Sequence, residues 1–297
     1  MEVIFYALLT VLSWGIWLAP SQTVEFDSER VRTFYVALAN LIVALLVGWA
    51  AGLNQLDLIT SLSAGAGGLI WALSGFCAFY ATSRLGIARA MGIWAPLNVV
   101  VSFIWGFFLF GELKGAPGSR WLMIGAAVLI ALIGIRFILF ASESGEQDST
   151  FHKGRMGIAA ALGAGLLWGT YFIPLRVADV PVWVSVLPLS LGIFAGSTLG
   201  VLLGRDSLRL NSGSDYLRTL STGVLWGVGN YGSLKLMELI GTGKGFTIAQ
   251  MCVVVNALVG IYWLQRPKPG TPAARRALLG VFLATIGGVV LGVARYS

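Results

Sequence analysis

Apolar runs of helical length alternate with short polar breaks along the whole chain. Ten runs are long enough for membrane helices, each of which needs about 20 largely apolar residues. The longest polar break, at 142–150, is rich in serine and acidic residues and falls at the midpoint of the chain. The runs cover residues 3–20, 33–53, 62–82, 90–110, 120–140, 156–175, 182–203, 219–240, 246–265 and 277–295.

Three short motifs of the first half recur in the second half, in the same order. Residues 14–20 read WGIWLAP, and residues 168–174, at an offset of 154, read WGTYFIP. The other two pairs lie 155 residues apart: GLIW at 68–71 with GVLW at 223–226, and GIAR at 86–89 with GTGK at 241–244. Three ordered matches at nearly one offset indicate an internal duplication.

Duplication of a unit with an odd number of helices has a topological consequence. The second copy must enter the membrane from the opposite side, which is a common plan of transporters with a substrate site near the midplane. We therefore predict an all-α integral membrane protein of ten transmembrane helices, arranged as two inverted five-helix repeats. The first repeat is 1–140, the cytoplasmic linker is 141–155 and the second repeat is 156–297.

Composition supports a membrane protein. The chain is 57% hydrophobic and only 11% charged, whereas a soluble protein carries roughly 25% charged residues. The net charge of +7 lies in short loops between apolar runs, a pattern that reflects membrane orientation rather than nucleic-acid binding. Met1 to Pro20 carries Glu2 instead of a basic leader and matches an internal segment, so we expect a retained first helix rather than a signal peptide.

Lysine and arginine in the loops predict the orientation. Thirteen of them fall on one side of the predicted topology and five on the other. We expect the protein to lie in the cytoplasmic membrane. The positive-inside rule then places both termini outside the cell and the linker in the cytoplasm. The larger set is Arg30, Arg32, Arg84, Arg89, Lys153, Arg155, Arg205, Arg209, Arg218, Arg266, Lys268, Arg275 and Arg276; the smaller set is Lys114, Arg120, Arg176, Lys244 and Arg295.

Aromatic and amide side chains inside the apolar runs are the candidate substrate residues. Aromatic faces can stack on the C–H faces of a sugar while amides bond to its hydroxyl groups, although aromatic stripes also serve plain helix packing. Asn230 is the strongest polar candidate, because hydrocarbon cannot satisfy its amide. The candidates are Trp14, Trp17, Trp71, Ser74, Trp94, Asn98, Trp168, Tyr171, Trp226, Asn230, Tyr231, Gln250 and Asn256.

A charged pair follows Tyr231 on the same helix face. Lys235 and Glu238 lie three residues apart, so they could form a structural ion pair near a helix end or take part in coupling. Glu238 is the one acidic candidate within a helix for coupling to protons.

Several function classes lack the residues they need. The single histidine, His152, lies in the linker, and the sequence has no cluster for a metal, no HExxH motif and no phosphate loop. We predict no metal, no cofactor and no enzymatic activity. A retinal-type receptor with Lys235 as its Schiff-base lysine would have seven helices and would leave the duplication unexplained.

The motifs resemble those of one transporter superfamily. The WG-to-Pro motif, FGE at 110–112, WGVGN at 226–230, GTGKG at 241–245 and Gln250 resemble the drug/metabolite transporter superfamily, and within it the glucose/ribose porters and rhamnose–proton symporters. The resemblance implies a central cavity lined by helices one, three, four, six, eight and nine, with Trp168, Trp226, Asn230 and Gln250 near the substrate. The second half departs from the pattern, because 265–267 reads QRP without an acid.

These observations predict a secondary active transporter that moves a monosaccharide by alternating access, with protons as the coupling ion that the resemblance implies. The alternative is an exporter of amino acids or of drugs and metabolites. The expected partners are the sugar and the lipid bilayer, and a stripe of small residues in the last run could form the seam of a homodimer.

Overall fold

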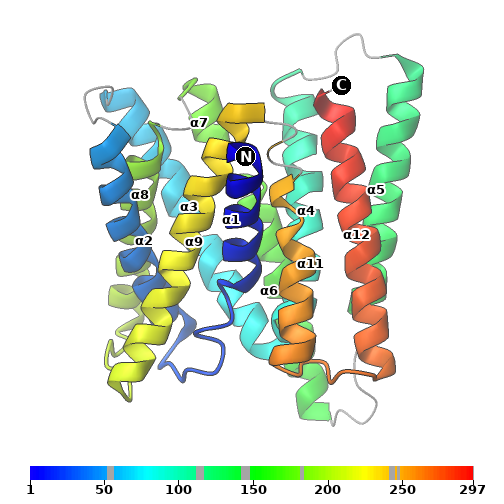
Figure 1. Ribbon diagram of the computed structural model, residues 1–297. Helices are drawn as coiled ribbons and strands as arrows, with labels where there is room; N and C mark the ends of the chain where they lie inside the picture. Colours follow the sequence, from blue (N-terminus) through cyan, green and yellow to red (C-terminus); the bar gives the residue numbers. More distant parts are fainter. Residues whose placement is uncertain are drawn as a thin grey trace.

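The structure, a computed structural model, describes residues 1–51, 57–111, 117–141, 148–180, 184–240, 245 and 248–296, without the side chains of 49–51, 148–153 and 294–296. The described helices form one bundle and run between the same two ends (Figure 1). They are α1 (Glu2–Ile16), α2 (Glu29–Ala51), α3 (Leu58–Leu85), α4 (Ile87–Phe108), α5 (Gly118–Leu139), α6 (Asp148–Trp168), α7 (Ile173–Val177), α8 (Val186–Gly204), α9 (Gly213–Ile240), α11 (Cys252–Leu258), the π-helix η2 (Val259–Trp263) and α12 (Pro272–Tyr296).

Each of the ten apolar runs corresponds to one helical segment, when α7 is counted with α6 and η2 with α11. Among the described residues, seven helices are long and apolar enough to cross a membrane, while α1 and the α11–η2 pair are shorter. The all-helical fold class and the multi-pass membrane character are therefore confirmed.

The repeated WG-to-Pro motif marks the end of a helix in both halves. The hydropathy of the first run predicts a helix to residue 20, but α1 ends at Ile16 and residues 17–23 form turns. In the second half α6 ends at Trp168, and the chain turns before Pro174 enters the short helix α7. A proline lacks the N–H that a helix interior requires, so the motif ends one helix and places its aromatic residues at the break.

Two local signals set the ends of α3. The Asp57 carboxylate accepts a hydrogen bond from the backbone N–H of Thr60 at 2.6 Å, which caps the first turn. At the other end Gly86 alone separates α3 from α4, with a φ of +75° that side chains rarely adopt. A Cβ there would also approach the Cβ of Arg266 to 3.1 Å, so both conformation and space favour glycine.

Small residues bring the helices into close contact, as expected where water does not drive association. Gly68 of α3 lies against the backbone of α8, and Gly134 of α5 lies against the backbone of Gly280 and Ala284 on α12. Gly280 and Ala284, two residues of the α12 stripe that suggested a dimer seam, thus pack against α5 within the protein.

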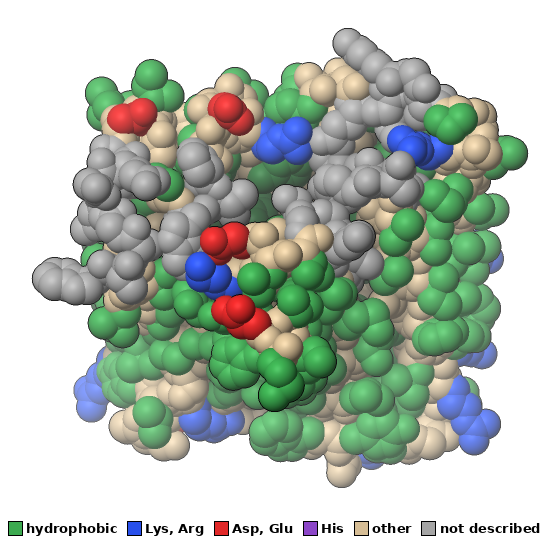
Figure 2. Space-filling view, turned by 45° about the horizontal axis from the view of Figure 1, so that its top comes forward, with side chains coloured by type: hydrophobic (Ala, Val, Ile, Leu, Met, Phe, Trp, Pro, Cys, Tyr) green, Lys and Arg blue, Asp and Glu red, His purple; other side chains and the backbone are tan. Residues whose placement is uncertain are grey.

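The two ends of the bundle differ in charge. Both termini lie at one end, which we call the terminal end, and α2, α4, α6, α9 and α12 all begin at the opposite, basic end (Figure 1). In Figure 2 apolar side chains cover the flank, acidic and some basic side chains lie toward the terminal end, and further basic side chains follow the far rim. Glu112 and the side chains of Lys114, Lys153, Lys244 and Arg295 lie outside the described part.

A bidentate ion pair at the basic end joins α2 to the segment after α8. Arg30 donates to both carboxylate oxygens of Asp206, at 2.6 and 2.7 Å, and Asp27 accepts from the backbone N–H of Ser207 at 2.8 Å. The hydrogen bonds from Arg30 hold the pKa of the Asp206 carboxyl below its usual value.

Because the folded pKa of Asp206 is depressed, its contribution to stability is complete above the unfolded pKa of about 4 and is lost as pH falls further. We expect acidification from about pH 5 to pH 3 to lower the melting temperature of the detergent-solubilised protein more than that of Asp206→Asn. Glu25→Gln, at an exposed position of the neighbouring segment, is the control and should follow the parent protein. Parallel curves for the parent and Asp206→Asn would contradict this role.

Candidate functional site

Four tryptophans from four helices form a continuous chain in the middle of the bundle. The ring centroids of Trp94 and Trp168 lie 5.3 Å apart, those of Trp168 and Trp71 5.6 Å, and those of Trp71 and Trp226 4.5 Å. All four are at least nine-tenths buried. We call these residues the tryptophan chain. Because α3 and α4 precede the linker and α6 and α9 follow it, the tryptophan chain connects the two halves of the sequence.

Glycines on neighbouring helices admit these large rings. Trp14 of α1 donates its indole N–H to the carbonyl of Trp226 at 3.2 Å and lies against Gly229, where a Cβ would collide with the indole. Gly165 of α6 lies against the backbone carbonyl of Trp94, and a Cβ added to Gly165 would lie 2.9 Å from that carbonyl oxygen. The glycines thus allow the neighbouring helices to approach the tryptophan-bearing helices closely.

The indole N–H of Trp168 is the unusual polar group of this site. Its Nε1 atom is buried and, within the described part of the protein, has no hydrogen-bond acceptor. The backbone beside it is satisfied, because Ser74 donates to the carbonyl of Ala164 at 3.0 Å. A buried donor without an acceptor costs roughly 1–3 kcal/mol, so such an atom at the centre of a fold is a candidate ligand contact.

Asn256 provides a second buried polar atom. Its Nδ2 donates to the carbonyl of Gly15 at 3.1 Å, while its Oδ1 is buried without a donor among the described residues. On α4, Asn98 accepts from Ser102 at 3.2 Å, and Ser102 also reaches the carbonyl of Gly169 at 3.4 Å. Asn98 is therefore engaged in contacts between α4 and the end of α6.

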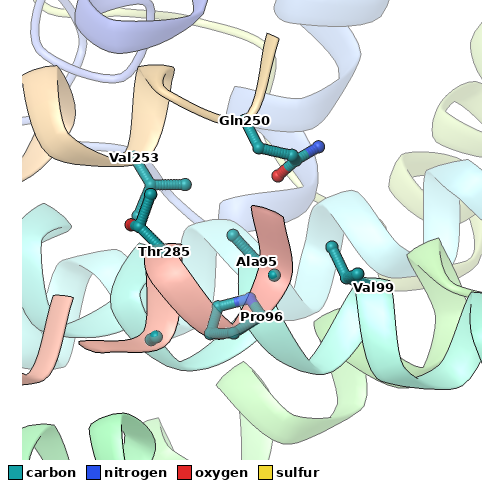
Figure 3. Close-up of a pocket in the computed structure, with 8 residues that line it drawn as sticks. Ala95, Pro96, Val99, Gln250, Val253 and Thr285 are labelled. Carbon is teal, nitrogen blue, oxygen red and sulfur yellow. The ribbon is translucent and has the colours of Figure 1, made fainter. Parts of the chain in front are cut away.

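Gln250 lines a small pocket between α4, the start of α11 and α12 (Figure 3). The pocket holds about 10 Å³ of free space, whereas small-molecule sites span about 300 Å³ or more. This space suits about one water molecule, so a monosaccharide requires the helices to move apart. The lining residues are Ala95, Pro96, Val99, Gln250, Val253, Ala284, Thr285 and Gly288.

The other predicted residues lie beside the tryptophan chain or away from it. Asn230 is half-buried and falls, by helical spacing, on the same side of α9 as the buried Trp226 and Ser233. Tyr171 is half-buried and packs against the main core, with its ring 6.5 Å from that of Phe172. Trp17 is buried but packs on Phe79, at 5.7 Å between ring centroids.

The charged pair lies at the terminal end rather than in the core. Lys235 donates to Glu238 at 2.8 Å, and the Glu238 side chain is 62% exposed. Tyr231 of the same helix lies 6.1 Å from Tyr6 of α1 between ring centroids. This geometry places the ion pair near the surface, apart from the tryptophan chain.

The comparisons with known proteins decide the family. A family model described as "Sugar transport protein" matches residues 5–294, which is nearly the whole chain. The chain belongs to this sugar transport family. Among the described residues of this sugar transport protein, no group of three metal-ligating side chains occurs. The family is a non-enzymatic one, so the site is built to bind and release rather than to react.

Relatives of this sugar transport protein occur in several bacteria. A Listeria monocytogenes protein assigned to sugar uptake is 26% identical, over 98% of this chain and 99% of its own. A Bacillus cereus protein named as a probable glucose uptake protein, GlcU, is 24% identical over 98% of this chain and 99% of its own. A solved crystal structure matches with a TM-score of 0.61 at 20% identity, over 99% of both chains, which supports the fold.

Two features of the structure are not apparent from the sequence. Thr285 reaches the small pocket from a helix predicted only to pack, and its Oγ1 is buried without a partner among the described residues. Arg32 is 2% exposed inside the bundle, although the hydropathy pattern groups it with the loop arginines. Arg32 directly precedes the apolar run at 33–53, and that position beside the run is the signal that could have identified it.

Proposed function

We propose that this protein carries a monosaccharide into the cell by alternating access, with the sugar held beside the tryptophan chain. The observation that carries the proposal is the buried Trp168 N–H, an unfilled donor flanked by the rings of Trp71 and Trp94. Stacked rings and a few isolated donors and acceptors suit a neutral polyhydroxylated ligand. The names of the relatives favour glucose within this class.

Alternating access needs two units that can move against each other, and we propose that they are inverted repeats. In support, the same contacts recur at an offset of 154 residues. Gly15 lies against Val255, and Gly169 lies against Val101. Asn256 donates to the carbonyl of Gly15, and Ser102 donates to the carbonyl of Gly169.

Helix packing supports the same proposal. α3 packs on α8 and α6, and its proposed counterpart α9 packs on α2 and α1. α4 packs on α6, and its counterpart α11 packs on α1. Exchange of each helix for its counterpart thus reproduces these contacts. In this arrangement α1–α5 and α6–α12 are the two repeats, their helices interlock, and the tryptophan chain contains residues of both.

We also propose that all ten segments cross the cytoplasmic membrane and that the basic end faces the cytoplasm. The charge difference between the ends is the support, because arginine-rich ends are retained inside. A reporter fused after Ser297 should be active only on the outer side. Activity in the cytoplasm would reverse the orientation.

Transport by the purified protein in vesicles tests the function. Counterflow of labelled glucose, ribose and rhamnose should exceed that of labelled amino acids, and Asn230→Ala should reduce it at least about tenfold at an equal protein level. The resemblance predicts coupling to protons. If so, a proton gradient directed into the vesicles should drive accumulation of the sugar inside them. Amino-acid or drug efflux without sugar counterflow would establish the exporter alternative and overturn the proposal.

A further inference from the structure

The turn segment after α1 closes the basic end of the bundle. Its buried residues, Trp17, Leu18, Ala19 and Ser21, are 3%, 0%, 5% and 0% exposed. The segment is inserted between helices rather than laid over them: Gln22 donates to the carbonyl of Thr82 on α3 at 2.7 Å, and Thr222 of α9 donates to Ser21 at 2.8 Å. It therefore connects α3 of the first half with α9 of the second.

Arg32 holds this segment from α2. It is the largest fully buried side chain among those described, and its guanidinium carbon lies 4.4 Å from the centroid of the Phe79 ring, which also packs on Trp17. Its hydrogen bonds go to Ser21 Oγ at 3.0 Å, the Leu18 carbonyl at 3.3 Å, Gln22 Oε1 at 3.3 Å and Thr82 Oγ1 at 3.4 Å. Three of these four acceptors belong to the turn segment itself.

The chemistry of this arrangement suits a joint that opens. The nearest carboxylate oxygen, on Glu29, lies 3.8 Å from Nη1, beyond hydrogen-bond distance, so neutral oxygens satisfy most of the guanidinium. A buried cation held by neutral groups recovers its hydration when water reaches it, which offsets the hydrogen bonds that opening breaks. Two states of similar free energy are what a gate requires.

The corresponding segment at the terminal end is less buried. By the 154-residue offset Trp17 to Ser21 correspond to Tyr171 to Leu175, all of which are half-buried, and the next two residues are exposed. Leu175 corresponds to Ser21 at this offset, and its side chain has no atom that can accept a hydrogen bond. The two ends are thus built differently within one duplicated plan.

We propose that residues 17–24 are the gate at the basic end of the transport pathway and that Arg32 is the positioning residue that keeps it closed. This inference rests on the proposed alternating-access function. Opening of the gate withdraws the segment from between α3 and α9, breaks its hydrogen bonds to Arg32 and exposes Ala19 to water.

Cysteine accessibility tests the gate without any sugar. In purified protein with Cys77 and Cys252 replaced by alanine, Ala19→Cys reports the basic end, and Ile173→Cys, at the corresponding position, reports the terminal end. Adding Arg32→Ala should speed maleimide labelling of Ala19→Cys about tenfold or more, because the hydrogen bonds from a charged donor are removed. Labelling of Ile173→Cys should slow at the same time, since the two ends open in alternation. Glu25→Cys, at an exposed position, should label rapidly in both backgrounds.

The outcomes separate a gate from a structural arginine. Unchanged labelling of Ala19→Cys, or faster labelling at both reporters, would overturn the proposal, because general loosening opens both ends. Arg32→Lys keeps the positive charge but loses the planar set of donors. With this substitution, the labelling rate of Ala19→Cys should fall between the rates with Arg32 and with Arg32→Ala. If Arg32→Ala does not fold, Thr222→Val and Gln22→Leu should produce the same opposite shifts, and no shift in either would overturn the gate. Failure of sugar counterflow alone leaves these labelling results intact and would count against the substrate only.

Discussion

Gly68→Ala is expected to destabilise the protein by about 2–3 kcal/mol, the upper range for overpacking a close contact. The added Cβ would collide with the carbonyl oxygen of Leu189 and approach Ile193 N to 2.7 Å and Gly192 C to 2.8 Å. All three are backbone atoms of α8, so no rotamer change can relieve the clash and the helices must separate. In detergent the apparent melting temperature should fall by roughly 5 °C or more.

Gly65→Ala is the matched control on the same helix. The nearest atom to its added Cβ would be the carbonyl oxygen of Pro188 at 3.9 Å, an ordinary contact. Since alanine also favours a helix by up to about 1 kcal/mol over glycine, this variant should be neutral or slightly more stable. Equal melting temperatures for Gly65→Ala and Gly68→Ala would contradict the close-packing account.

The proposed repeat extends this test to the second half. Gly223 follows Gly68 by 155 residues, and its added Cβ would collide with the carbonyl oxygen of Val36 on α2. Gly223→Ala should therefore destabilise the protein about as much as Gly68→Ala. A tolerated Gly223→Ala would show that the two interfaces do not share one design.

The number of helices could be predicted from the sequence because hydropathy measures burial in an apolar medium, and ten runs satisfy it. The helix ends could not, because hydropathy does not measure backbone hydrogen bonding. Residues 17–20 are apolar enough to extend the first run, yet they are buried as turns. The run at 246–265 contains α11 and a π-helical turn, a change of winding that leaves no mark on hydropathy.

Part of the candidate site could likewise be predicted from the sequence, and part could not. Trp71, Trp168 and Trp226 could be identified because the motifs that recur in both halves contain interior tryptophans, and these residues meet in the tryptophan chain. The packing of Trp17 and Arg32 on Phe79 could not, because it depends on a turn segment that inserts between helices. A buried arginine is costly, so the sequence pattern favours a loop position for Arg32, and only tertiary contacts reveal how it is satisfied.

These assignments imply a division of labour along the bundle. In the proposed mechanism, the tryptophan chain supplies stacking surface and a donor without an acceptor among the described residues, and the segments that follow α1 and α6 act at the two ends. Trp14 and Trp168 begin the repeated motif that leads from each helix into its turn segment. We therefore expect movement of either segment to reach the rings that would contact the sugar.

Trp168→Phe is expected to weaken sugar binding about tenfold, and the smaller ring should also lower the melting temperature because it leaves a cavity in the core. Phenylalanine keeps an aromatic face against Trp71 and Trp94 but removes the indole N–H. That donor has no acceptor among the described residues, so its loss removes a buried unpaired group and costs no protein hydrogen bond. The sugar hydroxyl that it serves in the complex loses a partner worth about 1–1.5 kcal/mol.

A matched substitution at a surface tryptophan makes the prediction specific. Trp121→Phe is the matched control, because Trp121 is 41% exposed on the flank and packs edge-on against Phe107. It should leave the dissociation constant unchanged. Binding is measured by isothermal titration of the purified protein with glucose, and stability by thermal unfolding of the same samples. Unchanged affinity in Trp168→Phe would remove this indole from the site.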